Sequence, residues 1–176
     1  MNHHLKLSMD GLYRKSVEEF KQIQKIPIYI VLDNIRSMHN VGSVFRTADA
    51  FLIQSIFLCG FTPSPPHREI QKTALGACDS VHWQYFNSTE LAIQFLQQKN
   101  IPFFAIEQTE NSTFLNNFIW DKSPIAFIFG NEVEGVSQEI INVCKDVIEI
   151  PQHGTKHSLN ISISTAIVLW HIMHTV

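Results

Sequence analysis

Ile28-Tyr29-Ile30-Val31-Leu32 is an uninterrupted apolar run that begins directly after Pro27. A short run without polar alternation is typical of a β-strand that is buried on both faces of a sheet. A polar stretch follows from Asp33 to Asn40. After it, apolar residues recur at helical spacing, namely Val41, Val44, Phe45, Ala48 and Leu52, and Arg46 lies off this core stripe. The segment therefore predicts a strand, a loop and an amphipathic helix, which is the repeating unit of an α/β fold.

The same alternation continues to the end of the chain. We predict further strands at residues 55–59, 81–86, 102–106, 124–129 and 147–150, and helices at 67–75, 89–98, 137–144 and about 159–174. Ser16 and Glu19 have the spacing of a capping box, which predicts a short helix that ends near Lys25. The expected organisation is an N-terminal helical extension, residues 1–25, and one α/β domain, residues 26–176, with a mainly parallel sheet flanked by helices.

Composition favours a folded protein with a covered apolar surface. Of the 176 residues, 45% are hydrophobic and 16% are charged, and 13 are Phe. Intrinsic disorder has the opposite signature of low hydrophobicity and high net charge. So little charge on one domain suggests that a second copy covers part of the surface, as in a homodimer. The last predicted helix is apolar nearly all round, so either its own fold or a partner chain buries its second side.

The charge is unevenly distributed along the chain. The net charge is −3, but residues 101–150 carry two Lys and eight Asp and Glu, whereas residues 1–25 carry five Lys and Arg and three acids. This is not the pattern of a strongly basic nucleic-acid coat. A polyanion would therefore bind a local patch outside residues 101–150, or a patch assembled by oligomerisation.

Cysteine usage and hydropathy predict a cytoplasmic protein without a membrane segment or metal site. Cys59, Cys78 and Cys144 are far apart and form no C-x-x-C pair, so neither a disulfide framework nor a cysteine-rich zinc site is expected. The first residues lack the apolar core of a signal peptide. The longest apolar stretch, Ile161 to Met173, is too short to span a bilayer. None of the nine His has a partner at convincing metal-ligand spacing.

The seven glycines exclude several common nucleotide-binding and hydrolytic sites. No two of them are separated by a single residue, so G-x-G-x-x-G and its Rossmann phosphate turn are absent. The stretch Gly154 to Ser158 lacks the Gly-Lys-Ser/Thr order of a P-loop, and there is no G-x-S-x-G elbow. Dinucleotide, NTP and α/β-hydrolase sites are therefore disfavoured, and so is the commonest class of methyltransferase, which also uses a Gly-rich turn.

Three polar segments next to predicted strands remain, and together they carry a resemblance. They read DNIRSMHNVGSVFRTADA (residues 33–50), IFGNEVEGV (128–136) and IPQHGTKHSLNIS (150–162). In this order and spacing they resemble the three motifs of the SpoU/TrmH family of RNA ribose 2′-O-methyltransferases, in the SPOUT class. The resemblance implies a SPOUT-type domain whose C-terminal part forms a deep trefoil knot, binds S-adenosylmethionine (SAM) and forms a homodimer.

The resemblance also assigns catalytic residues. The family's catalytic arginine and motif-one asparagine match Arg46 and Asn40, and its other motif residues match Glu132, Ser158 and Asn160. Because a guanidinium is essentially never deprotonated in proteins, we interpret Arg46 first as an electrostatic organiser and only second as a base. From the residues alone, Asn40 and Ser158 also suit helix N-caps. Gly42 would let another backbone come close.

The cofactor and RNA contacts are assigned in the same way. The residues expected at SAM are Ile106, Gly130, Asn131, Ile150, Gln152, Ser158 and Leu159, and Gln152 stands where the family commonly has Met. Gly130 would allow a ligand to approach the backbone closely, and Glu134 is expected to be solvated surface. The candidate phosphate contacts are Arg36, His39, Arg68, Lys72 and Lys156, for which ordinary solubilising charge is the alternative. His67, His153 and His157 are expected on the same RNA-facing surface.

The function expected from the resemblance is transfer of a methyl group from SAM to a ribose 2′-hydroxyl of structured RNA. The chain lacks a clear separate RNA-binding domain, which favours tRNA over rRNA. An RNA-binding module of the same fold without catalysis is the main alternative. An unrelated α/β small-molecule binder would require the three motifs to be a coincidence.

Overall fold

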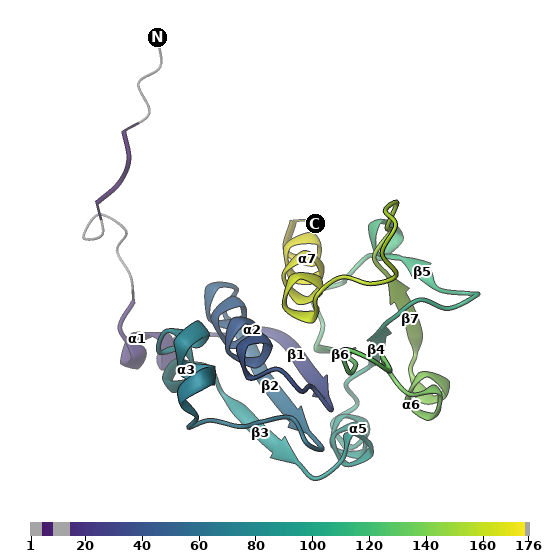
Figure 1. The fold of residues 1–176 in the computed structure, drawn as a ribbon. Coiled ribbons are helices and arrows are strands. Elements are labelled where there is room, and N and C mark those ends of the chain that lie inside the picture. Colours follow the sequence, from purple (N-terminus) through teal and green to yellow (C-terminus); the bar gives the residue numbers. More distant parts are fainter. Residues whose placement is uncertain (1–4, 9–14, 175–176) are drawn as a thin grey trace.

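The computed structural model describes residues 5–8 and 15–174, and its centre is a seven-stranded sheet (Figure 1). The strands are β1 (Ile26–Asp33), β2 (Ile53–Cys59), β3 (Trp83–Phe86), β4 (Phe103–Ile106), β5 (Thr113–Phe114), β6 (Ile125–Phe129) and β7 (Asp146–Glu149). Their order in the sheet is β3-β2-β1-β6-β4-β7-β5, and every strand pairing in the described residues is parallel. The predicted α/β class is confirmed.

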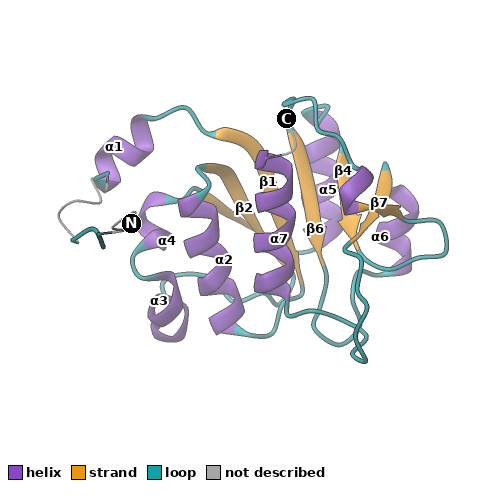
Figure 2. Ribbon diagram, turned by 90° about the horizontal axis from the view of Figure 1, so that it is seen from above, coloured by secondary structure: helices purple, strands orange, loops and turns teal. Residues whose placement is uncertain are grey.

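Helices cover both faces of the sheet (Figure 2). They are α1 (Val17–Gln22), α2 (Met38–Ala50), α3 (Arg68–Ala74), α4 (Ala77–Ser80), α5 (Thr89–Gln98), α6 (Gln138–Val143) and α7 (Ile161–His174), with a 3-10 turn, η2 (Leu115–Asn117). Helices α2, α3, α4 and α7 lie on one face, and α5 and α6 lie on the other. Each face of the sheet has its own hydrophobic core, and alternate residues of β1 belong to one or the other. Ile30 and Leu32 pack toward α2 and α7, whereas Val31 packs toward α5.

Local sequence signals placed most elements correctly. The capping box is present, with Ser16 Oγ accepting from the Glu19 amide and the Glu19 carboxylate accepting from Ser16. Three short elements, α4, β5 and η2, were not predicted. Leu75 and Gly76, both with positive φ, separate α4 from α3. β5 has only two residues, too few for a period of two to be visible.

The last helix begins two residues later than the predicted start at about Leu159. Asn160 caps it: its Oδ1 accepts from the Ser162 amide at 2.9 Å, and its carbonyl accepts from Ile163 and Ser164. α7 then packs beside α2 over the middle of the sheet (Figures 1 and 2). Neither α7 nor any other helix in the described residues has the length and hydropathy to cross a membrane.

The strand order changes direction between β1 and β6. The chain proceeds from β1 outward to β2 and β3, and the later strands build the other half of the sheet. In parallel α/β sheets, ligands bind at the carboxyl ends of the strands near such a switch point. The loops after β1, β4, β6 and β7 all begin at this carboxyl edge of the sheet, so the fold predicts a site among them.

Candidate active site

A cavity of about 640 Å³ lies at this edge, between the segments that follow β4, β6 and β7. Its walls come from residues 106–109, 129–141 and 150–164. All seven residues expected to hold the cofactor line it: Ile106, Gly130, Asn131, Ile150, Gln152, Ser158 and Leu159. The catalytic candidates Glu132 and Asn160 line it as well. The fold thus gathers residues from three separate stretches of sequence into one cavity.

A chain of side-chain hydrogen bonds connects the three motifs beside this cavity. Asn160 Nδ2 donates to Asn40 Oδ1 at 3.0 Å, and Asn40 Nδ2 donates to Glu132 Oε1 at 3.0 Å. Asn40 is therefore the middle member, with Asn160 at the start of α7 on one side and Glu132 after β6 on the other. The three side chains fix the start of α2 against both cavity-lining loops.

The Glu132 carboxylate also holds the backbone in front of α2. It accepts from the Arg36 amide at 2.9 Å and from the Ser37 amide at 3.1 Å. Burial raises the pKa of this carboxyl, but the hydrogen bonds from Arg36, Asn40 and Ser37 outweigh burial, so its pKa lies below the ordinary value. An ionised carboxylate at this position also interacts favourably with the N-terminal end of the helix dipole.

Two expected helix caps are wrong. Asn40 lies inside α2 and its amide donates to Ser37 Oγ at 3.2 Å, so Ser37 is the N-cap. Ser158 precedes α7 but does not cap it, because Asn160 has that role. In both cases two capping residue types stood close together in the sequence, and the backbone conformation selected the other one.

The loop after β6 is a tight turn closed by its own backbone. Asn131 and Gly135 exchange two backbone hydrogen bonds, of 3.1 and 2.9 Å. A Cβ on Gly130 would collide with the backbone of Gly135 and Val136. The absent side chain at Gly130 therefore makes room for this turn, where we expected close approach of a ligand. At Gly42 the expected close backbone approach is confirmed, since a Cβ there would collide with the Ile70 carbonyl.

Glu107 and Gln108, directly after β4, line the cavity but belong to none of the three motifs. A Glu107 carboxylate oxygen accepts from the Val136 amide at 3.1 Å, and Gln108 Nε2 donates to the His157 carbonyl at 2.7 Å. These two hydrogen bonds connect the loops after β6 and β7 to the residues that follow β4. Their position directly after a buried strand was the one available signal. Glu134, expected to be solvated surface, is exposed but also lines the cavity.

Arg46 is not part of the cavity wall. It lies on the exposed side of α2, and among the described residues it has no hydrogen-bond or ion-pair partner. This agrees with its predicted position off the core stripe. Within one chain, the structure therefore does not bring Arg46 together with the residues that line the cavity.

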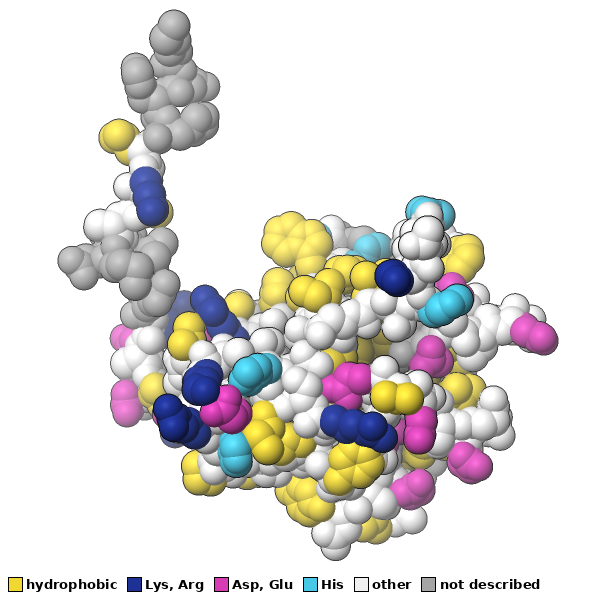
Figure 3. Space-filling model, in the orientation of Figure 1, with side chains coloured by type: hydrophobic (Ala, Val, Ile, Leu, Met, Phe, Trp, Pro, Cys, Tyr) yellow, Lys and Arg dark blue, Asp and Glu magenta, His cyan; other side chains and the backbone are white. Residues whose placement is uncertain are grey.

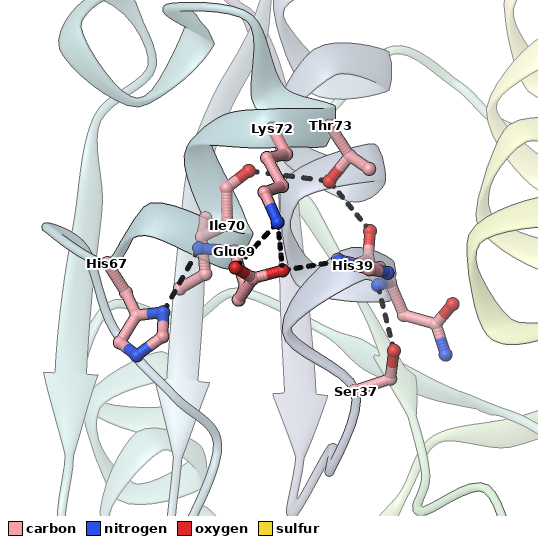
Figure 4. A network of polar contacts seen from close by, with 8 residues as sticks. Ser37, His39, His67, Glu69, Ile70, Lys72 and Thr73 are labelled. Atoms are coloured by element: carbon pink, nitrogen blue, oxygen red, sulfur yellow. Dashed lines mark hydrogen bonds and ion pairs between the residues drawn. The ribbon is translucent and has the colours of Figure 1, made fainter.

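The RNA candidates near α3 form a polar network with an acid (Figure 4). Glu69 accepts from Lys72 and faces His39 Nε2 at 3.0 Å, and hydrogen bonds from Lys72 and His39 keep the pKa of this exposed carboxyl below its ordinary value. His67 accepts from the Glu69 amide. Arg36, Arg68 and Lys156 are exposed. Glu69 thus offsets part of the positive charge expected from His39 and Lys72.

A second cavity of about 510 Å³ runs along α7 and is mainly apolar. Its walls include Phe51, Leu115, Ile163, Ile167 and Trp170. Within it, Trp170 is 60% exposed and Ile163 is 51% exposed.

No group of His, Cys, Asp or Glu in the described part of the chain is placed to hold a metal ion.

Comparison with known proteins is consistent with this architecture. The chain is 26% identical over 157 residues to the tRNA (guanosine(18)-2′-O)-methyltransferase of Thermus thermophilus, covering 89% of this chain and 79% of that protein. It is 28% identical over 145 residues to the 23S rRNA (guanosine-2′-O-)-methyltransferase RlmB of Blochmanniella floridana, covering 82% of this chain but only 56% of that relative. The chain thus spans little more than half of the rRNA-modifying relative.

Solved structures have the same fold. The AdoMet-bound rRNA methyltransferase from Sinorhizobium meliloti superimposes with a TM-score of 0.78 and 27% identity, covering 86% of this chain and 58% of that one. The A. aeolicus TrmH/SpoU tRNA modifying enzyme gives a TM-score of 0.77 at 21% identity, covering 88% and 78%. The model of the SpoU rRNA Methylase family matches residues 27–170, nearly the whole α/β domain. The chain therefore belongs to the SpoU family of RNA methylases.

Proposed function

We propose that this chain transfers a methyl group from SAM to a ribose 2′-hydroxyl of structured RNA. The observation that carries the proposal is the cavity at the switch point: residues of the second and third motifs line it, and Asn40 of the first motif is hydrogen-bonded to two of them, Glu132 and Asn160. Family membership and the AdoMet-bound relative support it.

The cavity fits SAM in size and chemistry. Its volume of about 640 Å³ lies within the range of about 300–1,000 Å³ that is usual for small-ligand sites. Ile106 and Ile150 line the cavity and suit an adenine ring, and the family resemblance assigns the edge of that ring to backbone groups near Gln152 and Leu159. The acidic side chains Glu107, Glu132 and Glu134 favour a cationic ligand. Gly130, Asn131 and Ser158 complete the proposed cofactor site.

The reaction places modest demands on the protein. When bound, SAM supplies a methyl group that is already activated by its sulfonium. The chain therefore has to align the acceptor hydroxyl and exclude water. We assign alignment to Glu132, Ser158 and Asn160, which line the cavity, and to Asn40, which is hydrogen-bonded to Glu132 and Asn160. Arg46 organises the acceptor and stabilises charge through its guanidinium.

The position of Arg46 outside the cavity supports a homodimer. A second copy that covers the apolar groove along α7 would remove Trp170 and Ile163 from water. In such an assembly we propose that Arg46 reaches toward the cofactor of the partner subunit.

We further propose that residues 26–176 form the methyltransferase domain, with a trefoil knot in the C-terminal part, and that residues 1–25 are a helical extension. Most of residues 1–14 lie outside the described part of the chain.

The proposed partner is RNA, with tRNA favoured over rRNA, in the cytoplasm. Relatives of both kinds match, and the tRNA-modifying relative is covered over the larger share of its length. Arg36, Arg68 and Lys156 are exposed and available for phosphates. His39 and Lys72 would contribute less while Glu69 engages them.

The test is transfer of labelled methyl from SAM to separate unmodified tRNA and rRNA pools, followed by digestion to nucleosides. We expect a 2′-O-methylnucleoside from one pool, and a loss of at least about 100-fold in rate for Arg46→Ala, the scale of removing one charge-stabilising group. A base-methylated product would contradict the proposal. SAM binding without transfer to either pool would favour the inactive RNA-binding module.

A further inference from the structure

An exposed phenylalanine follows β2 at the same edge of the sheet as the cofactor cavity. The Phe61 side chain is 58% exposed. Leaving a Phe ring in water forgoes hydrophobic stabilisation. Among the described residues, Phe61 makes no ring–ring contact. Packing within the described chain therefore does not account for an aromatic side chain at this position.

The backbone beneath Phe61 is held on both sides. Its amide donates to Asn34 Oδ1 at 3.2 Å, and the Gly60 carbonyl accepts from the Tyr85 hydroxyl at 2.8 Å. On the other side, Thr62 Oγ1 donates to the Leu32 carbonyl at 3.0 Å and accepts from the Ile35 amide at 2.9 Å. The ring therefore projects from a fixed base, and binding a ligand there would cost little ordering entropy.

Asn34 connects this base directly to the cofactor cavity. Its carbonyl accepts from Asn131 Nδ2 at 2.6 Å, and Asn131 lines the cavity. Asn34 has φ +54 and Gly60 has φ +62, so two residues in the left-handed region meet at one junction. The Asn34 side chain occupies the space that a Gly60 Cβ would need. Gly and Asn are the residues that adopt this region most readily, so their residue types allow the close junction.

A basic residue, Arg36, lies on the backbone segment that is hydrogen-bonded to the segment of Phe61. Arg36 is exposed, and its amide is bonded to Glu132 at the cavity. The hydrogen bonds from Phe61 to Asn34 and from Ile35 to Thr62 hold residues 34–36 alongside residues 60–62. In Figure 3, hydrophobic side chains gather over the ends of β1, β2 and β3, with a basic side chain among them. An aromatic face beside a guanidinium is the chemistry that binds an unstacked nucleobase and its phosphate.

We infer that Phe61 is a stacking platform for a nucleobase of the substrate RNA. The inference rests on the proposed function, because a ribose hydroxyl that enters the cavity belongs to a nucleotide whose base needs a surface outside it. A single residue, Asn34, connects Phe61 to the cavity wall, because it is hydrogen-bonded both to the Phe61 amide and to Asn131. Stacking on a π-face tolerates any base, so the platform holds the nucleotide and Arg36 holds its phosphate.

The test measures equilibrium binding of fluorescently labelled unmodified tRNA transcripts to the full chain, and separately of SAM. Phe61→Ala should weaken RNA binding on the order of 10- to 100-fold, the scale of losing one stacked base, and leave SAM binding unchanged. Phe61→Trp should restore RNA binding, whereas Phe61→Leu, which is apolar without a π-face, should not. Phe114→Ala is the matched control, since Phe114 is 47% exposed and lies on β5, the outermost strand on the side of the sheet away from β2.

The outcomes separate this inference from the proposed function. If the wild-type chain binds SAM and RNA, and Phe61→Ala binds RNA as tightly as the wild type, the stacking platform is overturned and the proposed function is not. Wild-type RNA affinity of Phe61→Leu would overturn the platform in the same way. Failure of the wild-type chain to bind SAM overturns the proposed function. In that case a selective RNA-binding loss in Phe61→Ala still supports the platform, and absence of RNA binding to the wild-type chain overturns it.

Discussion

Glu132 is the residue on which the start of α2 depends. Its carboxylate accepts from Arg36 and Ser37 in the backbone and from the side chain of Asn40. A glutamine has one acceptor oxygen, and its amide nitrogen would face donors. The ionised carboxylate, rather than the size of the side chain, therefore stabilises this junction.

Glu132→Gln should lower the free energy of unfolding at pH 7 by about 1–2 kcal/mol, somewhat less than is usual for hydrogen bonds to a charged group because Glu132 is solvent-exposed. Because the folded-state pKa of Glu132 is depressed, its contribution is present above the unfolded pKa, near 4.3, and is lost as pH falls through the folded pKa. Denaturant unfolding at pH 7 and about pH 3 checks this, and the difference between the two proteins should shrink at the lower pH.

Glu134→Gln is the control for this prediction. Glu134 lies in the same loop, and among the described residues its carboxylate accepts no hydrogen bond. Its substitution should leave the unfolding free energy within about 0.5 kcal/mol of wild type. Equal losses in the two variants would mean that loop charge, and not the bonds to α2, is responsible.

At the scale of elements, α7 has one buried side and one exposed apolar side. Val168, Leu169 and Ile172 are fully buried in the fold, whereas Ile163 and Trp170 line the open groove. The sequence left open whether the second side was embedded in the monomer or in a dimer. The structure removes the first possibility for these two residues, because more than half of each side chain is exposed within the chain.

Trp170→Glu should convert a dimer into a monomer with a folded core. A carboxylate in the centre of an apolar interface would be desolvated without a partner, which costs several kcal/mol. Sedimentation velocity at micromolar concentration measures the change, and circular dichroism checks the fold. Leu75→Glu is the control, since Leu75 is 66% exposed at the end of α3 and does not line the groove. A wild-type monomer, or a dimeric Trp170→Glu variant, would contradict the proposed assembly.

At the scale of the whole molecule, continuous apolar runs allowed the principal strands to be located from sequence. Apolar residues that recur at the helical period of 3.6 residues allowed the longer helices to be located as well. The β5 segment carries no such signal, because two residues define no period. The same limit applies to the site. Glu107 and Gln108 act on the backbones of Val136 and His157, which are 29 and 49 residues away, and no local pattern records those contacts.

The capping residues show a different limit. Ser37 and Asn40 are both favourable caps by residue type, and the sequence prediction, which named Asn40, was wrong. Met38, half-buried against the core, extends α2 toward Ser37. A helix that begins at Met38 has Ser37, and not Asn40, at its N-cap position. Arg46 was correctly placed off the core stripe, and its proposed role at the cavity rests on the proposed homodimer.

The central claim is that the cavity at the β1/β6 switch point binds SAM, and calorimetric titration with SAM tests it most directly. We predict one SAM per wild-type chain and at least about tenfold weaker binding to Gln152→Trp, whose side chain would fill the cavity that Gln152 lines. Leu75→Trp, away from the cavity, should bind as the wild type does. Absence of binding to the wild-type chain, or undiminished binding to Gln152→Trp, would contradict the assignment of this cavity.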